Sequence, residues 1–231
     1  MKIGVIILCR YDSTRLYGKA LIKIHKKPIL EWISLSIANC LNIDKICIAT
    51  SDEKSDDKIA EFCEKQNINC YRGSKLNVAK RFLNCAKQFD LDYTFRINGD
   101  NLFVDSALIS QMAEIASEQS FDFISNVEGR TFPIGMSVEL LKVSFFEEIY
   151  KKYNDERHFE HVTLYLYENP KVGNRKSIIN NKWEYLKGIH LAVDTIQDFN
   201  KAESIFQHAN GDYHKISYSF LNEMAREGRL S

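Results

Sequence analysis

The sequence has no long apolar run and no excess charge of either sign. Its apolar stretches near the N-terminus are about six residues long, too short for a signal peptide or a membrane span. Lys plus Arg number 31, as do Asp plus Glu, so no overall field attracts the chain to nucleic acid or to an anionic membrane. We therefore expect a cytoplasmic protein that binds neither nucleic acid nor membranes.

Two common nucleotide-binding motifs and paired cysteines are also missing. The chain has neither the GxxxxGK[ST] of a Walker loop nor the GxGxxG of a dinucleotide fold, which argues against kinase, ATPase and dehydrogenase functions. The six cysteines all lie in the first 85 residues, with no CxxC pair and no histidine at zinc-ligand spacing. We expect them to be reduced thiols that are mostly buried.

Apolar runs rich in Val and Ile alternate with segments of helical period, a pattern typical of parallel strands joined by crossover helices. With 231 residues, of which 45% are hydrophobic, the chain suits a single α/β domain with a sizeable core. The strands are expected at 2–8, 45–50, 69–71, 93–97, 121–125 and 188–193. The helices are expected at 29–41, 55–67, 77–89, 105–119, 143–153, 158–168 and 196–208.

Some helix starts carry recognisable signals. Pro28, one of only three prolines, stands at the entry of the first expected helix, where its missing N–H costs nothing. Asp105 is suited to cap a later helix, and Thr195 with Asp198 resembles a capping box. The segment 125–183 breaks the alternation of strands and helices, and we expect it to form a small subdomain that packs on the sheet or on a second subunit.

The tract directly behind the first apolar run is the most informative part of the chain. It reads L-C-R-Y-D-S-T-R-L-Y-G-K from Leu8 to Lys19 and holds three cations, two aliphatic hydroxyls and a glycine. Fixed backbone N–H donors and cations at the end of a strand bind phosphate groups. The tract therefore predicts a phosphate-binding loop, although taken alone it also fits a solvated basic turn. The members expected at a nucleotide are Leu8, Cys9, Arg10, Ser13, Thr14, Arg15 and Lys19.

Carboxylates follow two of the expected strands. Asn98-Gly99-Asp100-Asn101 comes after 93–97, and Asp194 comes after 188–193. Ligands of open parallel sheets lie outside the carboxyl ends of the strands, and Mg²⁺ prefers one or two carboxylates plus phosphate oxygens and water. We therefore expect Asp100 and Asp194 to bind Mg²⁺, although each alone also fits a turn or helix-capping residue.

Other strand ends are polar too. The second expected strand ends in Thr50-Ser51-Asp52, and the third is followed by Arg72-Gly73-Ser74. Small hydroxyl and amide groups contact a nucleobase and a ribose, and a glycine lets the backbone approach a ligand closely. The residues expected around the nucleotide are Thr50, Ser51, Asp52, Arg72, Asn77, Arg81, Asn98 and Gly99.

Seven motifs occur in a fixed order along residues 2 to 208. They are L-C-R-Y-D-S-T-R-L-Y-G-K-A-L, A-T-S-D, R-G-S-x-x-N-V-x-x-R, R-I-N-G-D-N-L, F-P-I-G-M-S-V-E, E-H-V-T-L-Y-L-Y-E-N-P and V-D-T-I-Q-D-F. In this order the chain resembles the cytidylyltransferases of the spore coat polysaccharide biosynthesis protein F type, which are related to the CMP-Kdo and CMP-acylneuraminate synthetases.

The resemblance implies a mostly parallel central sheet of the nucleotide-diphospho-sugar transferase type. It also implies transfer of CMP from CTP to a sugar acid or related acceptor, with release of pyrophosphate, for surface polysaccharide. By position, Arg10, Ser13, Arg15 and Lys19 would hold the triphosphate, Thr50, Ser51, Arg72 and Arg81 would surround the nucleoside, and Asp100 and Asp194 would bind the metal.

The acceptor side implied by the motifs is rich in cations, which favours an anionic sugar. It would include Arg130, Ser137, Glu139, Arg157, His158, Glu160 and His161. The two histidines, which Tyr165 and Tyr167 follow, fit an interfacial packing stripe equally well. The related synthetases also associate through the region of 125–183, so a homodimer is expected there, with Phe132, Phe145, Phe146, Tyr150, Tyr165 and Tyr167 as candidate interface residues.

The expected reaction is in-line attack of an acceptor oxygen on the α-phosphate of CTP, with Arg15 and Lys19 stabilising the departing pyrophosphate and Asp100 holding the metal. Whether Asp100, a water on the metal or His161 takes the acceptor's proton stays open.

The chain departs from the family pattern at four positions: Asp12 replaces a glycine, Tyr17 a proline, and Asn77 and Ser137 each an aspartate. Two other functions are compatible with such a fold. A glycosyltransferase would need a D-x-D motif where this chain has N-G-D-N, and a non-catalytic nucleotide-binding subunit would explain the departures.

Overall fold

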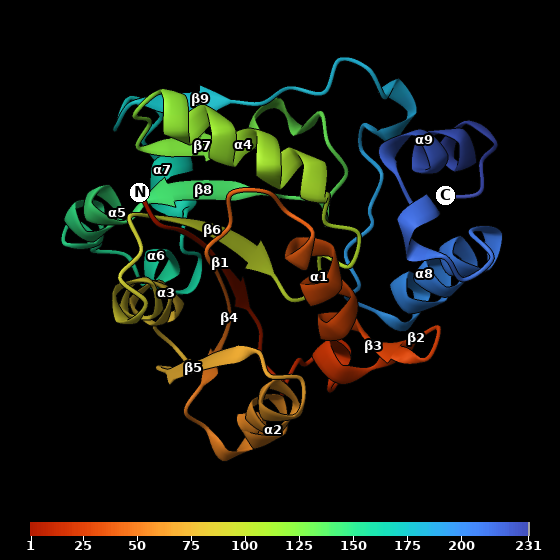
Figure 1. The fold of residues 1–231 in the computed structure, drawn as a ribbon, viewed down its shortest axis with the longest axis horizontal. Helices are drawn as coiled ribbons and strands as arrows, with labels where there is room; N and C mark the ends of the chain where they lie inside the picture. The colour runs from red at the N-terminus through yellow and green to blue at the C-terminus, as the bar shows by residue number, and fades with distance from the viewer. Residues whose placement is uncertain (231) are drawn as a thin grey trace.

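A sheet of seven strands in the order β5-β4-β1-β6-β8-β7-β9 forms the centre of the protein (Figure 1). The structure is a computed structural model and describes residues 1–230. The neighbours β5, β4, β1 and β6 are parallel, β8 runs antiparallel to β6 and β7, and β9 is parallel to β7. The predicted α/β fold with a mostly parallel sheet is thereby confirmed. The strands are β1 (Ile3–Leu8), β4 (Lys45–Ser51), β5 (Asn69–Gly73), β6 (Tyr93–Asn98), β7 (Phe123–Ser125), β8 (Glu139–Lys142) and β9 (Arg175–Ser177), and a short hairpin pairs β2 (Lys23–Ile24) with β3 (Lys27–Pro28).

Helices cover both faces of the sheet, as Figure 1 shows. They are α1 (Ile29–Ala38), α2 (Asp57–Lys65), α3 (Val78–Gln88), α4 (Ser106–Glu118), α5 (Val143–Tyr150), α6 (Glu156–Glu160), α7 (Leu164–Glu168), α8 (Ile196–His208) and α9 (Tyr218–Arg226). On β1, Val5 and Ile7 belong to one core cluster with residues of α1, α2 and α4, whereas Ile6 and Leu8 belong to a second cluster with α3 and α5. Burial on both faces explains why this strand reads as an unbroken apolar run.

The predicted helix starts are present. Pro28 is the N-cap of α1, and the Asp105 carboxylate accepts a hydrogen bond from Leu108 N at 2.7 Å at the start of α4. Thr195 and Asp198 form both halves of a capping box at the start of α8. The cysteines also follow the prediction, since all six are free: Cys9, Cys47, Cys63 and Cys85 are buried, and Cys40 and Cys70 are half-buried.

The strand expected at 188–193 is wrong. This segment forms a single bridge between Ile134 and His190, and beyond it Val193 N donates to Asp100 O at 3.1 Å. Its backbone groups therefore bond to loops instead of to a neighbouring strand. The helix expected over 158–168 is also wrong as one unit, because His161, Val162 and Thr163 separate α6 from α7. The segment 125–183 supplies β8, β9 and α5 to α7, and β8 and β9 belong to the central sheet.

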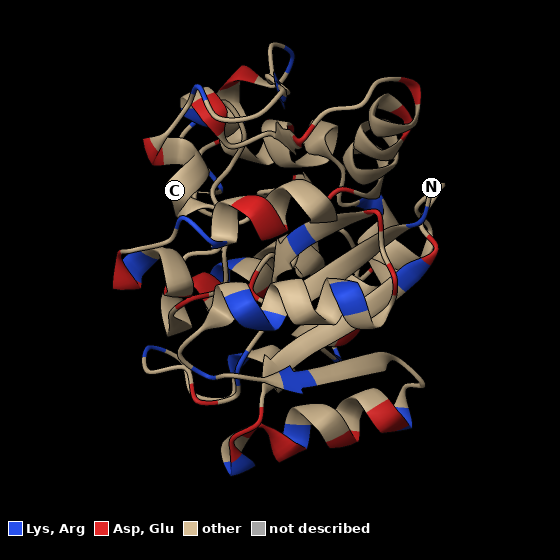
Figure 2. Ribbon diagram, turned by 90° about the vertical axis from the view of Figure 1, so that its left-hand side faces the viewer, with Lys and Arg blue, Asp and Glu red and all other residues tan. Residues whose placement is uncertain are grey.

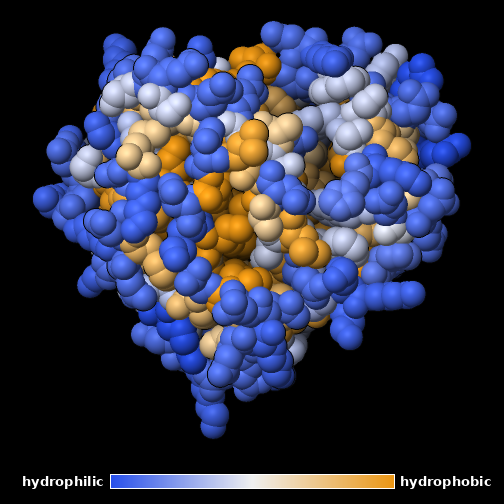
Figure 3. Space-filling model, in the orientation of Figure 1, coloured by the Kyte–Doolittle hydropathy of each residue, from blue (hydrophilic) through white to orange (hydrophobic). Residues whose placement is uncertain are grey.

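Charged residues of both signs are distributed over the ribbon in Figure 2, in line with the equal numbers of acids and bases. The face seen in Figure 3 has a polar rim and apolar side chains gathered near its centre, in the region where Figure 1 draws α1 and the strands behind it. Within residues 1–230, no helix is long and apolar enough to cross a membrane.

A buried carboxylate joins the ends of β1 and β4. The side chain of Asp56 is fully buried and accepts hydrogen bonds from Tyr11 N at 2.7 Å, from Thr50 Oγ1 at 2.8 Å and from Ser51 N at 2.9 Å. Burial alone would raise the pKa of this carboxyl, but the hydrogen bonds from Ser51, Tyr11 and Thr50 outweigh it and hold the pKa below its usual value. Asp56 is therefore ionised in the native state and fixes the loop behind β1 against the end of β4.

We expect Asp56→Asn to lower the free energy of unfolding by about 3 kcal/mol at pH 7, because the amide cannot accept all of these bonds. The corresponding fall in Tm is roughly 6 to 12 °C for a chain of this size. Since the native pKa of Asp56 is depressed, its contribution is complete above its unfolded pKa of about 3.9 and is lost as the pH falls below that value. The measurement is urea unfolding of both proteins at pH 7 and at pH 3.

The matched control is Asp57→Asn, which removes the next carboxylate along the chain. Asp57 is 45% exposed and pairs with Arg72, so its loss is expected to change the stability by less than about 1 kcal/mol. Equal effects of the two substitutions, or a difference between wild type and Asp56→Asn that does not shrink at pH 3, would contradict the role given to Asp56.

Candidate functional site

The loop behind β1 closes on itself before the short 3-10 turn of residues Lys19–Leu21. Gly18 N donates to Tyr11 O at 2.8 Å, and Gly18 has a φ of 68°, a left-handed conformation that favours glycine. The closed loop turns its polar side chains toward a cavity at the carboxyl ends of β1 and β6. This is the edge of the sheet where the sequence predicts a ligand.

The cavity has a volume of about 400 Å³, within the range of small-molecule sites. Most of the residues expected at the phosphates and around Asp100 do line it. The lining consists of Leu8, Cys9, Arg10, Asp12, Ser13, Thr14, Arg15, Lys19, Ala20, Val78, Arg81, Arg96, Asn98, Gly99, Asp100, Glu160 and His161.

The floor of this cavity depends on a glycine. Gly99 N donates to Leu8 O at 2.8 Å, which brings the end of β6 against the end of β1. A Cβ added to Gly99 would lie 2.5 Å from the Cβ of Cys9, so any other residue would push the two strand ends apart. The Cys9 thiol is buried, and this burial raises its pKa far above the usual value. Cys9 is therefore a packing residue and not a nucleophile.

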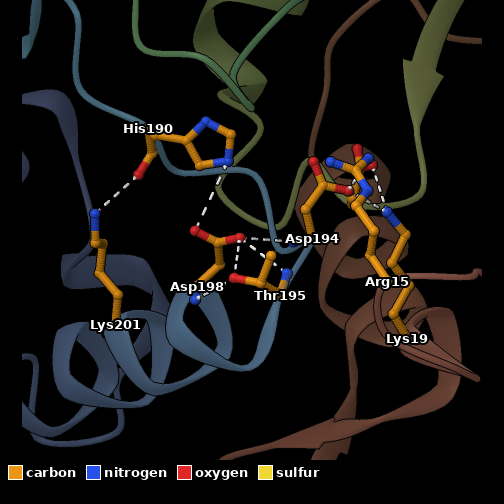
Figure 4. A network of polar contacts seen from close by, with 8 residues as sticks. Arg15, Lys19, His190, Asp194, Thr195, Asp198 and Lys201 are labelled. Carbon is orange, nitrogen blue, oxygen red and sulfur yellow. Dashed lines mark hydrogen bonds and ion pairs between the residues drawn. The ribbon is translucent and has the colours of Figure 1, made fainter.

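Asp100 and Asp194 converge on one ammonium group. Lys19 Nζ lies 2.7 Å from Asp100 Oδ2 and 2.7 Å from Asp194 Oδ1, and Arg15 Nη2 lies 2.9 Å from the same Asp194 oxygen. Figure 4 shows Arg15 and Lys19 pointing toward Asp194. Burial lowers the pKa of Lys19, but Asp100 and Asp194 outweigh this and hold the pKa above its usual value.

The start of α8 positions Asp194. The Asp198 carboxylate accepts hydrogen bonds from Asp194 N at 3.2 Å and Thr195 N at 2.9 Å (Figure 4). His190 Nε2 lies 3.8 Å from the other Asp198 oxygen. The bond from Val193 N to Asp100 O then fixes the turn that carries Asp194 to the turn that carries Asp100. Asp194 thus comes from a loop and a helix start, and not from a strand end as the sequence predicts.

The donor set at this point fits a divalent cation of the Mg²⁺ type. Two carboxylate oxygens already lie at equal distances from one cationic nitrogen, and Mg²⁺ takes one or two carboxylates together with substrate phosphate oxygens and water. Within residues 1–230, no group of three or more His, Cys, Asp or Glu side chains is arranged to hold a metal. The remaining ligands would therefore come from the substrate and from solvent.

Two guanidinium groups line the cavity from the sheet and from α3. Arg81 is 2% exposed, and its Nη1 donates to Ser74 O at 2.8 Å. Burial lowers its pKa from the usual value, and within the described residues its Nε has no hydrogen-bond partner. A buried cation with few partners beside a cavity is suited to an anionic or carbonyl oxygen of a ligand.

A buried carboxylate holds the second guanidinium, that of Arg96. Its Nη1 is paired with Glu139 on β8, and its Nη2 donates to Asn98 Oδ1 at 3.0 Å. Glu139 is 1% exposed and also accepts hydrogen bonds from Thr163 Oγ1 at 2.9 Å and Tyr167 OH at 2.6 Å. Glu139, expected at the acceptor, therefore lies behind the cavity, where it orients Arg96 and through it Asn98.

Several residues expected at the nucleoside have other partners. Thr50 and Ser51 bind Asp56, and Asn77 caps α3 by accepting from Lys80 N at 2.8 Å. Arg72 donates to the backbone oxygens of Ser51 and Glu53. These residues and Asp52 are not among those that line the cavity.

On the expected acceptor side, only Glu160 and His161 line the cavity. His158 is 5% exposed and lies 2.7 Å from Glu168, packed against the ring of Tyr153, so it packs within the chain and does not reach the cavity. Arg157 pairs with Asp155 and Glu168. Arg130 and Ser137 lie outside the cavity lining, and Ser137 O accepts from Asn101 Nδ2 at 3.0 Å.

The departures in the first loop are accommodated. Asp12 pairs with Lys75 and lies 3.9 Å from Arg10, so its negative charge is balanced before any phosphate arrives. The ring of Tyr17 packs edge-on against that of Tyr11 at 5.1 Å, which supports the loop where the family has a proline.

Sequence reasoning overlooked Arg96 and Asp56 as parts of this site. Arg96 had a signal, because residues 96 and 98 alternate along β6 and so share one face of the strand that leads to Asp100.

Comparison with known proteins identifies the family of the chain. The family model described as Cytidylyltransferase matches residues 4–222. An uncharacterized protein of Methanocaldococcus jannaschii is 36% identical over 201 residues, covering 86% of this chain and 81% of that protein. The spore coat polysaccharide biosynthesis protein SpsF of Bacillus subtilis is 27% identical over 221 residues, covering 94% and 90%.

Solved structures show the same fold. A cytidylyltransferase from Leptospira borgpetersenii superposes with a TM-score of 0.90 at 25% identity and covers 100% of this chain and 96% of its own. A CMP:2-keto-3-deoxy-manno-octonic acid synthetase complexed with CTP superposes with a TM-score of 0.68 at 13% identity and covers 90% of this chain and all of its own. The chain belongs to the cytidylyltransferase family.

Proposed function

We propose that this enzyme transfers CMP from CTP to a sugar acid and releases pyrophosphate, in the biosynthesis of a surface polysaccharide. The observation that carries the proposal is the convergence of Asp100 and Asp194 beside a loop of phosphate-binding type. The similarity to SpsF, whose name assigns it to spore coat polysaccharide biosynthesis, supports the polysaccharide setting. The synthetase complexed with CTP supports the nucleotide.

In this mechanism the chain mainly positions groups and stabilises charge. Arg10, Ser13 and Thr14 line the cavity from the loop behind β1 and would hold the triphosphate. Asp100 and Asp194 would hold Mg²⁺, which when bound neutralises charge on phosphate oxygens. Arg81 would contact an oxygen of the nucleotide from α3.

The transfer forms one bond and breaks another at the α-phosphorus. A hydroxyl oxygen of the acceptor bonds to the α-phosphorus, and the bond from that phosphorus to the oxygen bridging to the β-phosphate breaks. The electron pair leaves with pyrophosphate, whose charge Arg15 and Lys19 stabilise. The acceptor's proton passes to a base, and Asp100 and His161 are the candidates that line the cavity.

An anionic acceptor fits the cations that the cavity presents. The Arg96 guanidinium lines it, and Glu139 holds this group in a fixed orientation. A planar guanidinium pairs well with a carboxylate. This support differs from the sequence expectation, since Arg130 and Arg157 do not line the cavity.

A homodimer through 125–183 stays part of the proposal, although the aromatic residues of this segment also make contacts within the chain. Phe132 and Phe146 are buried within the chain, and Phe145, Tyr150, Tyr165 and Tyr167 pack against the second core cluster. Exposed apolar side chains of this segment are Ile134 and Ile179. An interface here would use those side chains and their polar neighbours.

We expect pyrophosphate release to require CTP, with the other nucleoside triphosphates slower by on the order of 10²-fold or more in kcat/KM. The measurement is pyrophosphate release from each triphosphate with Mg²⁺. The acceptors tested are a 2-keto sugar acid, its reduced neutral analogue and a sugar phosphate. Equal release with ATP or GTP would contradict the base assignment. Turnover confined to the neutral compound would contradict an acidic acceptor.

We expect Asp100→Asn to reduce turnover by on the order of 10²-fold or more, because a charged ligand of the metal is lost. The fold is expected to persist, since Asp100 is at the surface of the cavity. Steady-state rates together with circular dichroism test this, and Asp90→Asn, an exposed carboxylate before β6, is the control. A near-normal rate for Asp100→Asn would remove this aspartate from the mechanism.

A further inference from the structure

Lys19 lies where the proposed function needs a metal ion. Its Nζ is 2.7 Å from an oxygen of Asp100 and 2.7 Å from an oxygen of Asp194, the two carboxylates assigned to the divalent cation. Arg15 Nη2 adds a second cation 2.9 Å from the same Asp194 oxygen (Figure 4). Lys19 and the metal would therefore compete for the same pair of carboxylates.

The cluster is electrically balanced without a metal. Two carboxylates face one ammonium and one guanidinium, and the side chains of Lys19, Asp100 and Asp194 are only 15%, 20% and 13% exposed. Charge-assisted hydrogen bonds in such a partly buried place are stronger and less screened than at the surface. A divalent ion that arrives alone would compete with both bonds of Lys19 and would lie close to its ammonium.

The chain also offers such an ion few ligands. No third acidic, histidine or cysteine side chain joins Asp100 and Asp194 in a metal-binding group within the described part of the chain. Mg²⁺ demands near-octahedral oxygen coordination and gives up water reluctantly. Two carboxylates that already have cationic partners are a poor site for the free ion.

A bound triphosphate would change both the pairing of the carboxylates with Lys19 and the shortage of ligands for the metal. It supplies further oxygen ligands for the metal, and its negative charge gives Lys19 a new partner within the same cavity, which Lys19 and Arg15 both line. The lysine side chain has a flexible four-carbon stem, so its ammonium is able to move while the backbone stays in place.

We propose that Lys19 holds the cation position between Asp100 and Asp194 in the nucleotide-free protein, and thereby makes metal binding conditional on the triphosphate. This inference rests on the proposed function for the identity of the metal ligands. By linkage, the factor by which nucleotide raises metal affinity equals the factor by which metal raises nucleotide affinity.

The test measures Mn²⁺ binding to the full chain without nucleotide, by the electron paramagnetic resonance signal of free Mn²⁺. The variant is Lys19→Met, which keeps the length of the side chain and removes its charge. We expect it to bind Mn²⁺ at least about tenfold more tightly than wild type, in the range of typical coupling between sites. Lys19→Arg, which keeps the cation, is expected to bind as weakly as wild type.

Two controls separate a local effect from a general one. Lys23→Met removes one positive charge at an exposed position outside the cavity and is expected to leave Mn²⁺ affinity unchanged. The double variant Lys19→Met with Asp194→Asn is expected to lose the gained affinity. If Lys19→Met does not fold, Lys19→Gln serves in its place with the same expectation.

Each outcome decides the proposal. Wild type that binds Mn²⁺ as tightly as Lys19→Met would overturn the competition while leaving the metal site intact. Failure of both uncharged variants to gain affinity would overturn it as well. Pyrophosphate release by wild type with CTP is measured separately, so loss of this inference is distinguishable from loss of the proposed function.

Discussion

The contact between Gly99 and Cys9 is the constraint on which the site depends. Because Gly99 has no side chain, its N–H reaches Leu8 O at 2.8 Å and the ends of β1 and β6 meet. Every group that lines the floor of the cavity is placed relative to this junction. The loop that we propose to bind phosphate leaves from Cys9, and the turn that carries Asp100 leaves from Gly99.

Buried carboxylates then connect this junction to the rest of the molecule. Asp56 fixes the loop behind β1 to the end of β4, and Glu139 fixes Arg96 on β6 to β8 and to the helices behind it. In both cases the acid is fully engaged with donors of the chain. These acids hold the side chains that reach the cavity and do not enter it themselves.

The same arrangement gives two acidic side chains at the site cationic partners before substrate arrives. Asp12 is balanced by Lys75 and Arg10, and Asp194 is balanced by Lys19 and Arg15. The departures Asp12 and Tyr17 thus have local partners and need no loss of activity to explain them. The remaining cations, Arg81 and Arg96, come from a helix and a strand that the core holds rigidly.

The parallel core of the fold was predictable from the sequence, because strands buried on both faces are unbroken apolar runs and the helices between them have clear period and caps. The loop from Cys9 to Lys19 and the turn at Asp100 were predictable for the same reason, since both directly follow such strands. By contrast, 188–193 has the composition of a strand, but the backbone groups of Val193 and its neighbours bond to loops. Composition does not reveal which partner a backbone group finds.

Side-chain roles behind the cavity were not predictable for a similar reason. The hydroxyls of Thr50 and Ser51 are suited to a nucleoside, but a buried carboxylate six residues further on takes the bond from Thr50. The helix 158–168 breaks at a residue, Thr163, whose hydroxyl bonds to Glu139 on a distant strand. Which partner each of these hydroxyls bonds to depends on tertiary contacts, and a local sequence pattern does not contain them.

The position of Asp194 at the very start of α8 has a dynamic consequence. Its backbone N–H bonds to Asp198, the residue that also closes the capping box of that helix. Terminal turns of helices open locally at much lower free energy than the whole domain unfolds. A brief fraying of this one turn would therefore loosen Asp194 while the sheet stays folded, so the position of this carboxylate depends on the capping interaction of a single helix.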